Sequence, residues 1–443
     1  MARKNSKTPS EGRSSNEGRD EAHHAPRVGR LPYSGLGNDA VSRLEEANGK
    51  LGGKVFDFHL HKLRTKNFVG VVAAGGTTVE ILPKIHEGNA ANLGYLLALL
   101  RYTGTLTTKR GEVADLGEHG GSFLEAWIHH FAAELNRLLR ANYKQKYVEV
   151  EERSSFVRGK LLTERDLGGS SKIHARYPCR YEIFTPDHLL NRTLKFCNSL
   201  LMKQTRSPAN RTLLRQNDAL LADVEDAPVF ARDLDRIHLD RLNREYEPIL
   251  ELCRLLLENS SLDLRAGRIT QLALVFDMNT LFEKFVAEFL RRNKESIFIG
   301  GARVEKVETK RDLGRLFGEF KMEVDVALHT PGGTYLLDTK YKVLEDEKDH
   351  AGLSQPDFYQ MHAYATAGEW KYGGVILLYP KTAASPPEKD FVNGRDGVRL
   401  FVRLIDPAAI HAGGGRVSEG IVVREMNAAF SGVEAVENRE GAA

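Results

Sequence analysis

Cysteine is scarce and long apolar runs are absent in this sequence of 443 residues. The three cysteines, Cys179, Cys197 and Cys253, lie far apart and form no CxxC pair, which excludes a disulfide scaffold, a zinc ribbon and a four-cysteine iron–sulfur cluster. Apolar runs such as residues 93–100 are far shorter than the roughly 20 residues that cross a bilayer. Because an apolar signal-peptide core is missing as well, we expect a cytoplasmic protein without a membrane segment.

A phosphate-binding loop is also absent. The pattern GxxxxGK[ST], whose backbone amides cradle nucleotide phosphates, occurs nowhere, and the nearest match, Arg158-Gly159-Lys160, lacks the first glycine. Any activity driven by nucleotide hydrolysis must therefore take its nucleotide chemistry from another subunit.

Positive charge is present in only a small excess. The formal net charge is +3, and residues 1–30 account for all of it with seven basic and four acidic side chains. Because the rest of the chain is neutral, contact with nucleic acid has to come from local basic patches rather than from a global field.

Composition and periodicity divide the chain into five parts, with enough apolar residues (41%) to bury sizeable cores. Residues 1–45 contain few large apolar side chains and are expected to form a disordered polar tail. Residues 46–95 show two-residue alternation, typical of a β-rich module, and residues 96–264 are mostly helical. Residues 265–425 combine helices and strands, and residues 426–443 form a C-terminal tail. We therefore expect an α/β chain that is α+β overall.

One helix of the middle region has a clear start signal. Apolar side chains recur at helical spacing from residue 122 to residue 143, and Ser122 and Glu125 have the spacing of a capping box. The sequence therefore predicts an amphipathic helix that begins at Ser122.

The region after residue 276 alternates between helical and strand periodicity. Its predicted elements are a helix at 279–292, strands at 303–308, 320–328 and 335–343, a helix at 354–367 and a buried strand at 374–379. The second and third strands flank the turn residues at 331–333 and form a β-hairpin. This order predicts a mixed sheet flanked by helices.

Three charged residues of this hairpin form a candidate catalytic site. Asp338 and Lys340 project from one face of the same strand, and Asp325 lies within reach on the preceding strand. Carboxylate oxygens are the natural ligands of magnesium, which neutralises charge that develops on a phosphate during hydrolysis. A neighbouring lysine can position the attacking water. We therefore predict Asp325 and Asp338 as metal ligands and Lys340 as a catalytic residue.

Further polar residues surround this trio in the sequence. Glu283 on the first helix is predicted as an auxiliary catalytic acid and a third metal ligand, direct or through water. Gln360 and Tyr364, one helical turn apart, and Lys342 are predicted to support the site or to contact DNA. Structural alternatives stay open at this point: Glu283 can belong to a capping box that starts at Thr280, Asp325 can pair with a neighbouring lysine, and the helix face can be ordinary.

The complete pattern resembles the PD-(D/E)xK nuclease superfamily. This resemblance implies a restriction-endonuclease-like fold for residues 265–425. The chain as a whole is similar to the McrC family, the nuclease subunit of the McrBC 5-methylcytosine-specific restriction systems. The segments that carry this second resemblance are VGV at 69–71, VEILPKI at 79–85, YEIFTPD at 181–187, NRTLK at 191–195, FDMNTLFE at 276–283 and DTKYK at 338–342.

The resemblance implies a division of labour between two subunits of a type IV, modification-dependent defence system. In such systems an AAA+ subunit, McrB, binds and hydrolyses GTP. The McrC-like chain stimulates that GTPase through its N-terminal half, here the β-rich module, and cuts double-stranded DNA with its C-terminal half. We thus expect a Mg²⁺-dependent endodeoxyribonuclease. Two alternatives are a non-catalytic regulator of an AAA+ ring and a standalone RecB-like repair nuclease.

Overall fold

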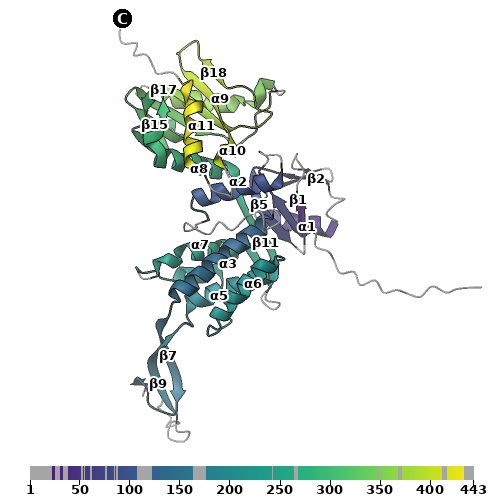
Figure 1. The fold of residues 1–443 in the computed structure, drawn as a ribbon, viewed down its shortest axis with the longest axis vertical. Coiled ribbons are helices and arrows are strands. Elements are labelled where there is room, and N and C mark those ends of the chain that lie inside the picture. Colours follow the sequence, from purple (N-terminus) through teal and green to yellow (C-terminus); the bar gives the residue numbers. More distant parts are fainter. Residues whose placement is uncertain are drawn as a thin grey trace, which may run out of the picture.

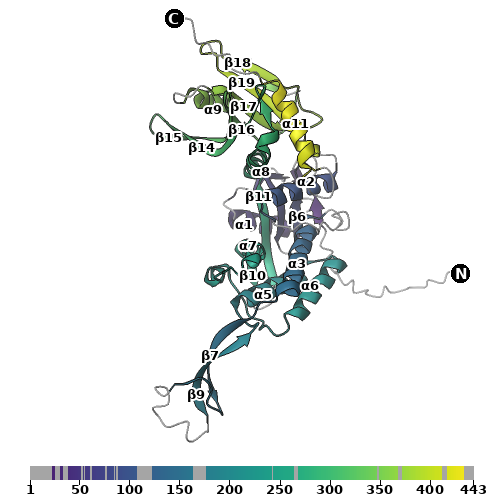
Figure 2. The ribbon, with the colours of Figure 1, turned by 60° about the vertical axis from the view of Figure 1, so that its left-hand side comes forward.

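The computed structural model describes residues 22–24, 30–32, 38–50, 53, 55–59, 62–74, 77–83, 85, 88–106, 122–162, 176–241, 243–263, 268–346, 349–367, 372–411 and 417–433. The molecule is elongated, with the C-terminal domain at one end, an N-terminal sheet near the middle and a β-ribbon at the other end (Figures 1 and 2). Within these ranges, no helix combines the length and the apolar character needed to span a membrane.

The N-terminal sheet recruits strands from two distant parts of the chain. Its strand order is β1-β6-β5-β11-β10, and β11 pairs antiparallel with β5. The bounds are β1 Ala22–His24, β5 Phe68–Ala74, β6 Thr77–Ile81, β10 Ser260–Asp263 and β11 Arg268–Asp277. The expected start of the C-terminal domain at residue 265 therefore falls beside a strand that belongs to the N-terminal sheet. The region between β6 and β10 is an insertion into this sheet.

The expected tail at residues 1–45 contains regular structure in its second half. Helix α1 spans Asn38–Lys50 and buries Val41, Leu44 and Ala47, whose spacing of three residues places them on one helix face. A small sheet of order β2-β4-β3 lies in the same part of the chain, with bounds β2 Arg30–Pro32, β3 Phe56–His59 and β4 Lys62–Thr65. Residues 1–21 lie outside the described residues.

The inserted middle region is mostly helical, as expected. Its helices are α2 Asn89–Tyr102, α3 Phe123–Asn142, α5 Leu189–Gln204, α6 Pro208–Leu220 and α7 Glu247–Glu258. Ser122 caps α3 by accepting a hydrogen bond from Glu125 N at 3.3 Å, which confirms the predicted helix start. The Glu125 side chain does not complete the predicted capping box, because it accepts hydrogen bonds from Arg206 N and Ser207 N, the two residues that precede α6.

A long β-ribbon within this region was not predicted from the sequence. Strands β7 Lys146–Ser154 and β9 Tyr177–Thr185 pair antiparallel along their whole length, and the short β8 Lys160–Leu161 joins the other edge of β9. Most of its side chains are exposed, so little apolar burial marks these strands in the sequence. The ribbon projects from the helices at the end of the molecule opposite the C-terminal domain (Figure 1).

The C-terminal domain is built on a six-stranded mixed sheet of order β14-β15-β16-β17-β19-β18. The strands are β14 Lys306–Leu316, β15 Phe320–Thr330, β16 Gly333–Thr339, β17 Tyr372–Pro380, β18 Lys389–Val392 and β19 Arg399–Ile405. Strands β14, β15 and β16 are antiparallel neighbours, whereas β17 runs parallel to both β16 and β19. The predicted mixed α/β fold is confirmed.

Helices cover both faces of this sheet. Side chains of α8 Met278–Asn293 and α11 Glu419–Ser431 pack in one core with Val326, Leu337 and Ile376. Helix α9 Gln355–Thr366 packs on the opposite face against Val324 and Leu336. The remaining short elements are β12 Phe298–Ile299, β13 Ala302–Arg303 and α10 Pro407–Ile410.

Candidate active site

The two predicted aspartates lie at a fork in the sheet. The ladder between β15 and β16 ends at the pair Val326 and Leu337, and Asp325 and Asp338 are the next residue on each strand. Beyond this point β15 continues with β14 only, and β16 continues with β17. Asp325 Oδ2 accepts hydrogen bonds from the backbone N and the Oγ1 of Thr339, both at 2.7 Å, which fixes its carboxylate at the fork.

Lys340 and the α9 side chains join the aspartates. Lys340 Nζ lies 2.7 Å from Asp338 Oδ2 and donates a hydrogen bond of 3.0 Å to Gln360 Oε1. Gln360 Nε2 in turn donates to Asp338 Oδ1 at 3.4 Å and to the Tyr364 hydroxyl at 2.6 Å. The Tyr364 hydroxyl donates to Glu323 O at 2.7 Å and so ties α9 to β15. The structure therefore brings these predicted residues together in one network.

Burial sets the protonation behaviour of the network. Asp338 is only 2% exposed, and both this desolvation and the nearby Asp325 carboxylate raise its pKa. Desolvation alone would lower the pKa of Lys340, but the Asp338 carboxylate outweighs it, so the pKa of Lys340 is raised. A raised pKa favours the charged form of Lys340, which can donate hydrogen bonds but cannot accept a proton.

Glu283 lies on the α8 side of the same site. Its carboxylate is 3.5 Å from Lys310 Nζ of β14, and desolvation together with the charge of Asp325 raises its pKa. The capping-box alternative for Glu283 is wrong, because α8 begins at Met278 and its N-cap is Asp277, which accepts from Asn279 N at 2.9 Å. Glu283 therefore lies close enough to Asp325 for the two charges to interact, and it does not cap α8.

Comparison with known proteins places this geometry in a family. The family described as McrBC 5-methylcytosine restriction system component matches residues 63–380, which is most of the chain. The chain belongs to this family. The predicted McrC-family resemblance is thereby confirmed. None of the curated proteins matches the sequence.

One of two similar solved structures shares the fold of this chain. A chain of the refined half-complex from the tetradecameric assembly of Thermococcus gammatolerans McrB AAA+ hexamers with bound McrC superposes with a TM-score of 0.72 and 18% identity, over 92% of this chain and 100% of that chain. A chain of the cryo-EM structure of the Thermococcus gammatolerans McrBC complex has a TM-score of 0.49 and 20% identity, over 61% of this chain and 87% of that chain.

Asp357 is a site residue of this McrBC-family chain that sequence reasoning missed. Lys342 Nζ lies 2.6 Å from Asp357 Oδ2, and the Tyr379 hydroxyl donates to the same oxygen at 3.2 Å. Predicted support residue Lys342 is therefore held by α9 and lies beside the network. The spacing of Asp357, Gln360 and Tyr364 along one helix face was the available signal.

The donor set at the fork fits a magnesium ion held mainly by water and two carboxylates. Asp338 Oδ2 is buried and accepts no hydrogen bond in proper geometry, although it forms the ion pair with Lys340. Mg²⁺ commonly uses only one or two protein carboxylates and keeps several waters. Across the described part of the chain, no three His, Cys, Asp or Glu side chains converge to hold a metal. The buried Oδ2 of Asp338, which accepts no hydrogen bond, is the observation that suits a cation at the fork.

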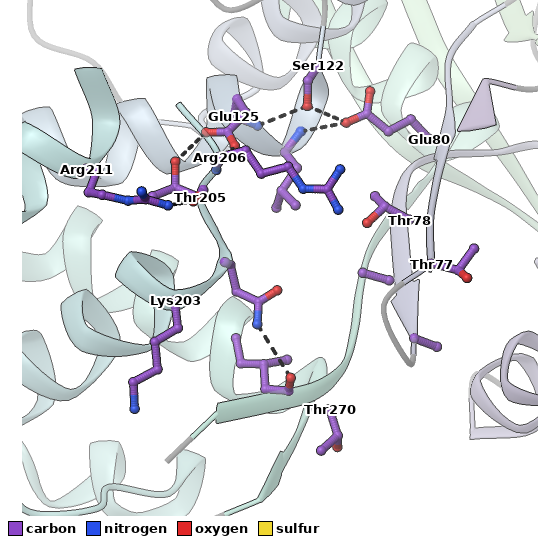
Figure 3. A pocket seen from close by; sticks show the side chains of 15 residues that line it. Thr77, Thr78, Glu80, Ser122, Glu125, Lys203, Thr205, Arg206, Arg211 and Thr270 are labelled. Carbon is purple, nitrogen blue, oxygen red and sulfur yellow. Dashed lines mark hydrogen bonds between the residues drawn. The ribbon is translucent and has the colours of Figure 1, made fainter. Parts of the chain in front are cut away.

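A separate polar cavity of about 540 Å³ lies in the N-terminal half of this family member, lined by Glu80, Glu125 and Arg206 among others (Figure 3). Its two acidic side chains accept hydrogen bonds from backbone N–H groups at the starts of helices. Glu80 accepts from Phe123 N at 3.0 Å and Leu124 N at 3.2 Å at the start of α3, and Glu125 binds the start of α6. These carboxylates therefore cap the starts of α3 and α6.

Proposed function

We propose that this chain is the DNA-cutting subunit of a modification-dependent restriction system, a Mg²⁺-dependent endodeoxyribonuclease that works with a separate AAA+ GTPase. The observation that carries the proposal is the fork, where Asp325, Asp338 and Lys340 meet at the point at which β15 and β16 diverge. Two anionic groups and one cationic group in such an arrangement suit hydrolysis of a phosphodiester. Membership of the McrBC family supports restriction of DNA as the biological task.

Each side chain then has a defined task. Asp325 and Asp338 would hold the magnesium ion, whose charge lowers the cost of building negative charge on the phosphate. Thr339 fixes the Asp325 carboxylate, and Gln360 fixes both Asp338 and Lys340. Because Lys340 is protonated, its ammonium group donates hydrogen bonds that orient a water molecule and stabilise the pentavalent phosphate.

A partner subunit completes this function. The Thermococcus McrC chain with the same fold is bound to McrB AAA+ hexamers, and the present sequence contains no phosphate loop of its own. The β-rich module at residues 46–95 stays the expected contact for such a partner. The projecting β7–β9 ribbon offers further exposed apolar side chains, among them Phe156 and Val157 just after β7. We therefore propose an McrB-like GTPase as partner and duplex DNA carrying a modified base, such as 5-methylcytosine, as substrate.

The decisive experiment separates DNA cutting from GTPase stimulation. Asp338→Asn keeps the shape of the side chain and removes its charge, so we expect DNA cleavage by the complex of this chain with its GTPase to fall at least a thousand-fold. GTP turnover by the partner should be stimulated as by the wild type. Asp235→Asn, an exposed aspartate remote from the fork, is the matched control and should leave both activities unchanged.

Other outcomes support the alternatives. If neither the wild type nor the variant cuts DNA while GTP turnover is stimulated, the chain is a regulator of an AAA+ ring. Cleavage by the purified chain without any partner would instead support a standalone nuclease.

A further inference from the structure

The strands β14 and β15 continue past the active-site fork as a free two-stranded ribbon. They pair antiparallel from Lys306 with His329 to Leu316 with Phe320, whereas β16 accompanies β15 only up to Val326. Figure 2 shows this ribbon extending away from the body of the C-terminal domain. Asp325 therefore stands at the root of the ribbon, and any phosphate bound there lies beside it.

The tip of this ribbon is apolar and exposed. Phe317 is 88% exposed and Phe320 is 70% exposed, and Leu316 beside them is also exposed. Water-exposed aromatic rings on a hairpin tip give the fold itself little burial energy. They are therefore available for a partner surface.

The tip also holds its shape in an unfavourable backbone conformation. Phe317 has a φ of 53°, a left-handed conformation that costs a bulky residue free energy. The turn is closed by hydrogen bonds from Glu319 N to Leu316 O at 3.1 Å and from Arg315 Nη1 to Glu319 O at 3.0 Å. An unfavourable backbone conformation at an exposed aromatic residue points to a function for this tip.

Cations flank the rings on both strands. Arg315 and Lys321 pair across the ribbon next to the tip, and Lys321 is bridged to Glu323 on its own strand. Lys310 lies nearer the root, where it faces Glu283. Acids of the same ribbon, among them Glu319 and Glu323, lie between these cations. Cations that bind phosphates, next to apolar side chains that contact base edges, are typical of contacts to duplex DNA.

We propose that the β14–β15 ribbon enters the major groove of the duplex that is being cut, with Phe317 and Phe320 against the bases. This inference rests on the proposed nuclease function. A two-stranded ribbon fits the width of the major groove. From Phe320 to Asp325 the strand rises about 17 Å, at roughly 3.3 Å per residue, which corresponds to about five base pairs of DNA. The tip would thus grip the duplex about half a helical turn from the scissile phosphate.

The first test measures how much DNA the complex of this chain with its GTPase needs for half-maximal cleavage. Phe317→Ser is expected to raise this concentration about ten-fold, which corresponds to the loss of one apolar contact with base edges worth about 1.4 kcal/mol. GTP turnover by the partner should not change. Phe298→Ser, at a partly exposed phenylalanine of β12, is the matched control and should behave as the wild type.

The second test identifies what the tip touches, independently of cleavage. A photoreactive benzoylphenylalanine in place of Phe317, combined with Asp338→Asn, should cross-link to duplex DNA in the assembled complex. Cross-linking to the GTPase subunit or to a second copy of this chain would overturn the proposal. If the tip cross-links to DNA but the complex with the wild-type chain never cuts DNA, the proposed ribbon contact stands and the proposed nuclease function is rejected. An unchanged DNA requirement for Phe317→Ser in a complex that does cut would reject the ribbon alone.

Discussion

The two exposed β-ribbons of this protein differ in what lies at their roots. The β7–β9 ribbon grows out of the helical region, and its rooted end carries the contacting rings of Tyr147 and Phe184. The β14–β15 ribbon grows out of the sheet at Asp325, next to Asp338. Both present exposed aromatic side chains, so exposure alone does not distinguish their tasks. Their positions do, because only the second ribbon shares a strand with the candidate catalytic residues.

The largest expected effect tests whether DNA is cleaved at the base of the β14–β15 ribbon, beside Asp325 and Asp338. Lys340→Met removes the ammonium group while keeping much of the side-chain volume. Loss of a preorganised charge at a developing oxyanion costs about a hundred- to a thousand-fold in rate, so we expect cleavage to fall by that factor. Single-turnover cleavage with saturating DNA is the measurement. The exposed Lys381→Met is the control, and equal cleavage by both variants would remove Lys340 from the mechanism.

A smaller effect is expected when the first ribbon is altered. Phe156→Ser with Val157→Ser removes two exposed apolar side chains close to where β7 ends. If this ribbon meets the GTPase, its stimulation of GTP turnover should weaken about ten-fold. That factor corresponds to about 1.4 kcal/mol, as expected when the two side chains are only partly covered, because full burial of one alone contributes roughly 1.5–3 kcal/mol. Affinity of the assembled complex for DNA, measured by fluorescence anisotropy, should not change. A loss of DNA affinity at equal GTP turnover would reverse the assignments of the two ribbons.

The smallest effect concerns pH and tests whether the carboxylates at the base of the β14–β15 ribbon bind magnesium. Burial and the charge of Asp325 raise the pKa of Asp338, and burial raises that of Glu283. Protons therefore compete with magnesium more strongly as the pH falls, because the metal binds only the ionised carboxylate. We expect the Mg²⁺ concentration for half-maximal cleavage to be several-fold higher at pH 6 than at pH 8. The same requirement at both pH values would contradict the assigned ligands.

Local pattern was enough to find the catalytic candidates. Asp338 and Lys340 share a strand face by simple alternation, and the turn at residues 331–333 places Asp325 opposite them. Gln360 and Tyr364 follow from helical spacing. The divergence of β15 from β16 could not be foreseen, because it depends on which strand finds a partner beyond Val326. The strand expected at 303–308 is in fact Lys306–Leu316, since its charged, exposed outer half shows no apolar alternation.

Long-range pairing was the other feature hidden from the sequence. Strand β11 reads as the start of the C-terminal domain, yet it pairs with β5, some two hundred residues earlier. The first ribbon was missed for a different reason, because its exposed strands carry many glutamates and little apolar periodicity. Sequence periodicity reports burial within one element and is silent about distant partners.

The placement of β11 governs how this protein can be divided. This strand completes the N-terminal sheet and passes at Asp277 directly into α8, and Met278 N donates a hydrogen bond of 2.8 Å to Asn67 O. A truncation before residue 268 would strip β5 of a neighbour and leave an unpaired edge prone to aggregation. A truncation after residue 277 would carry that strand away from the helix that holds Glu283. The N-terminal sheet and the helix that carries Glu283 are thus joined without a linker, so a movement of β11 would be passed directly to α8.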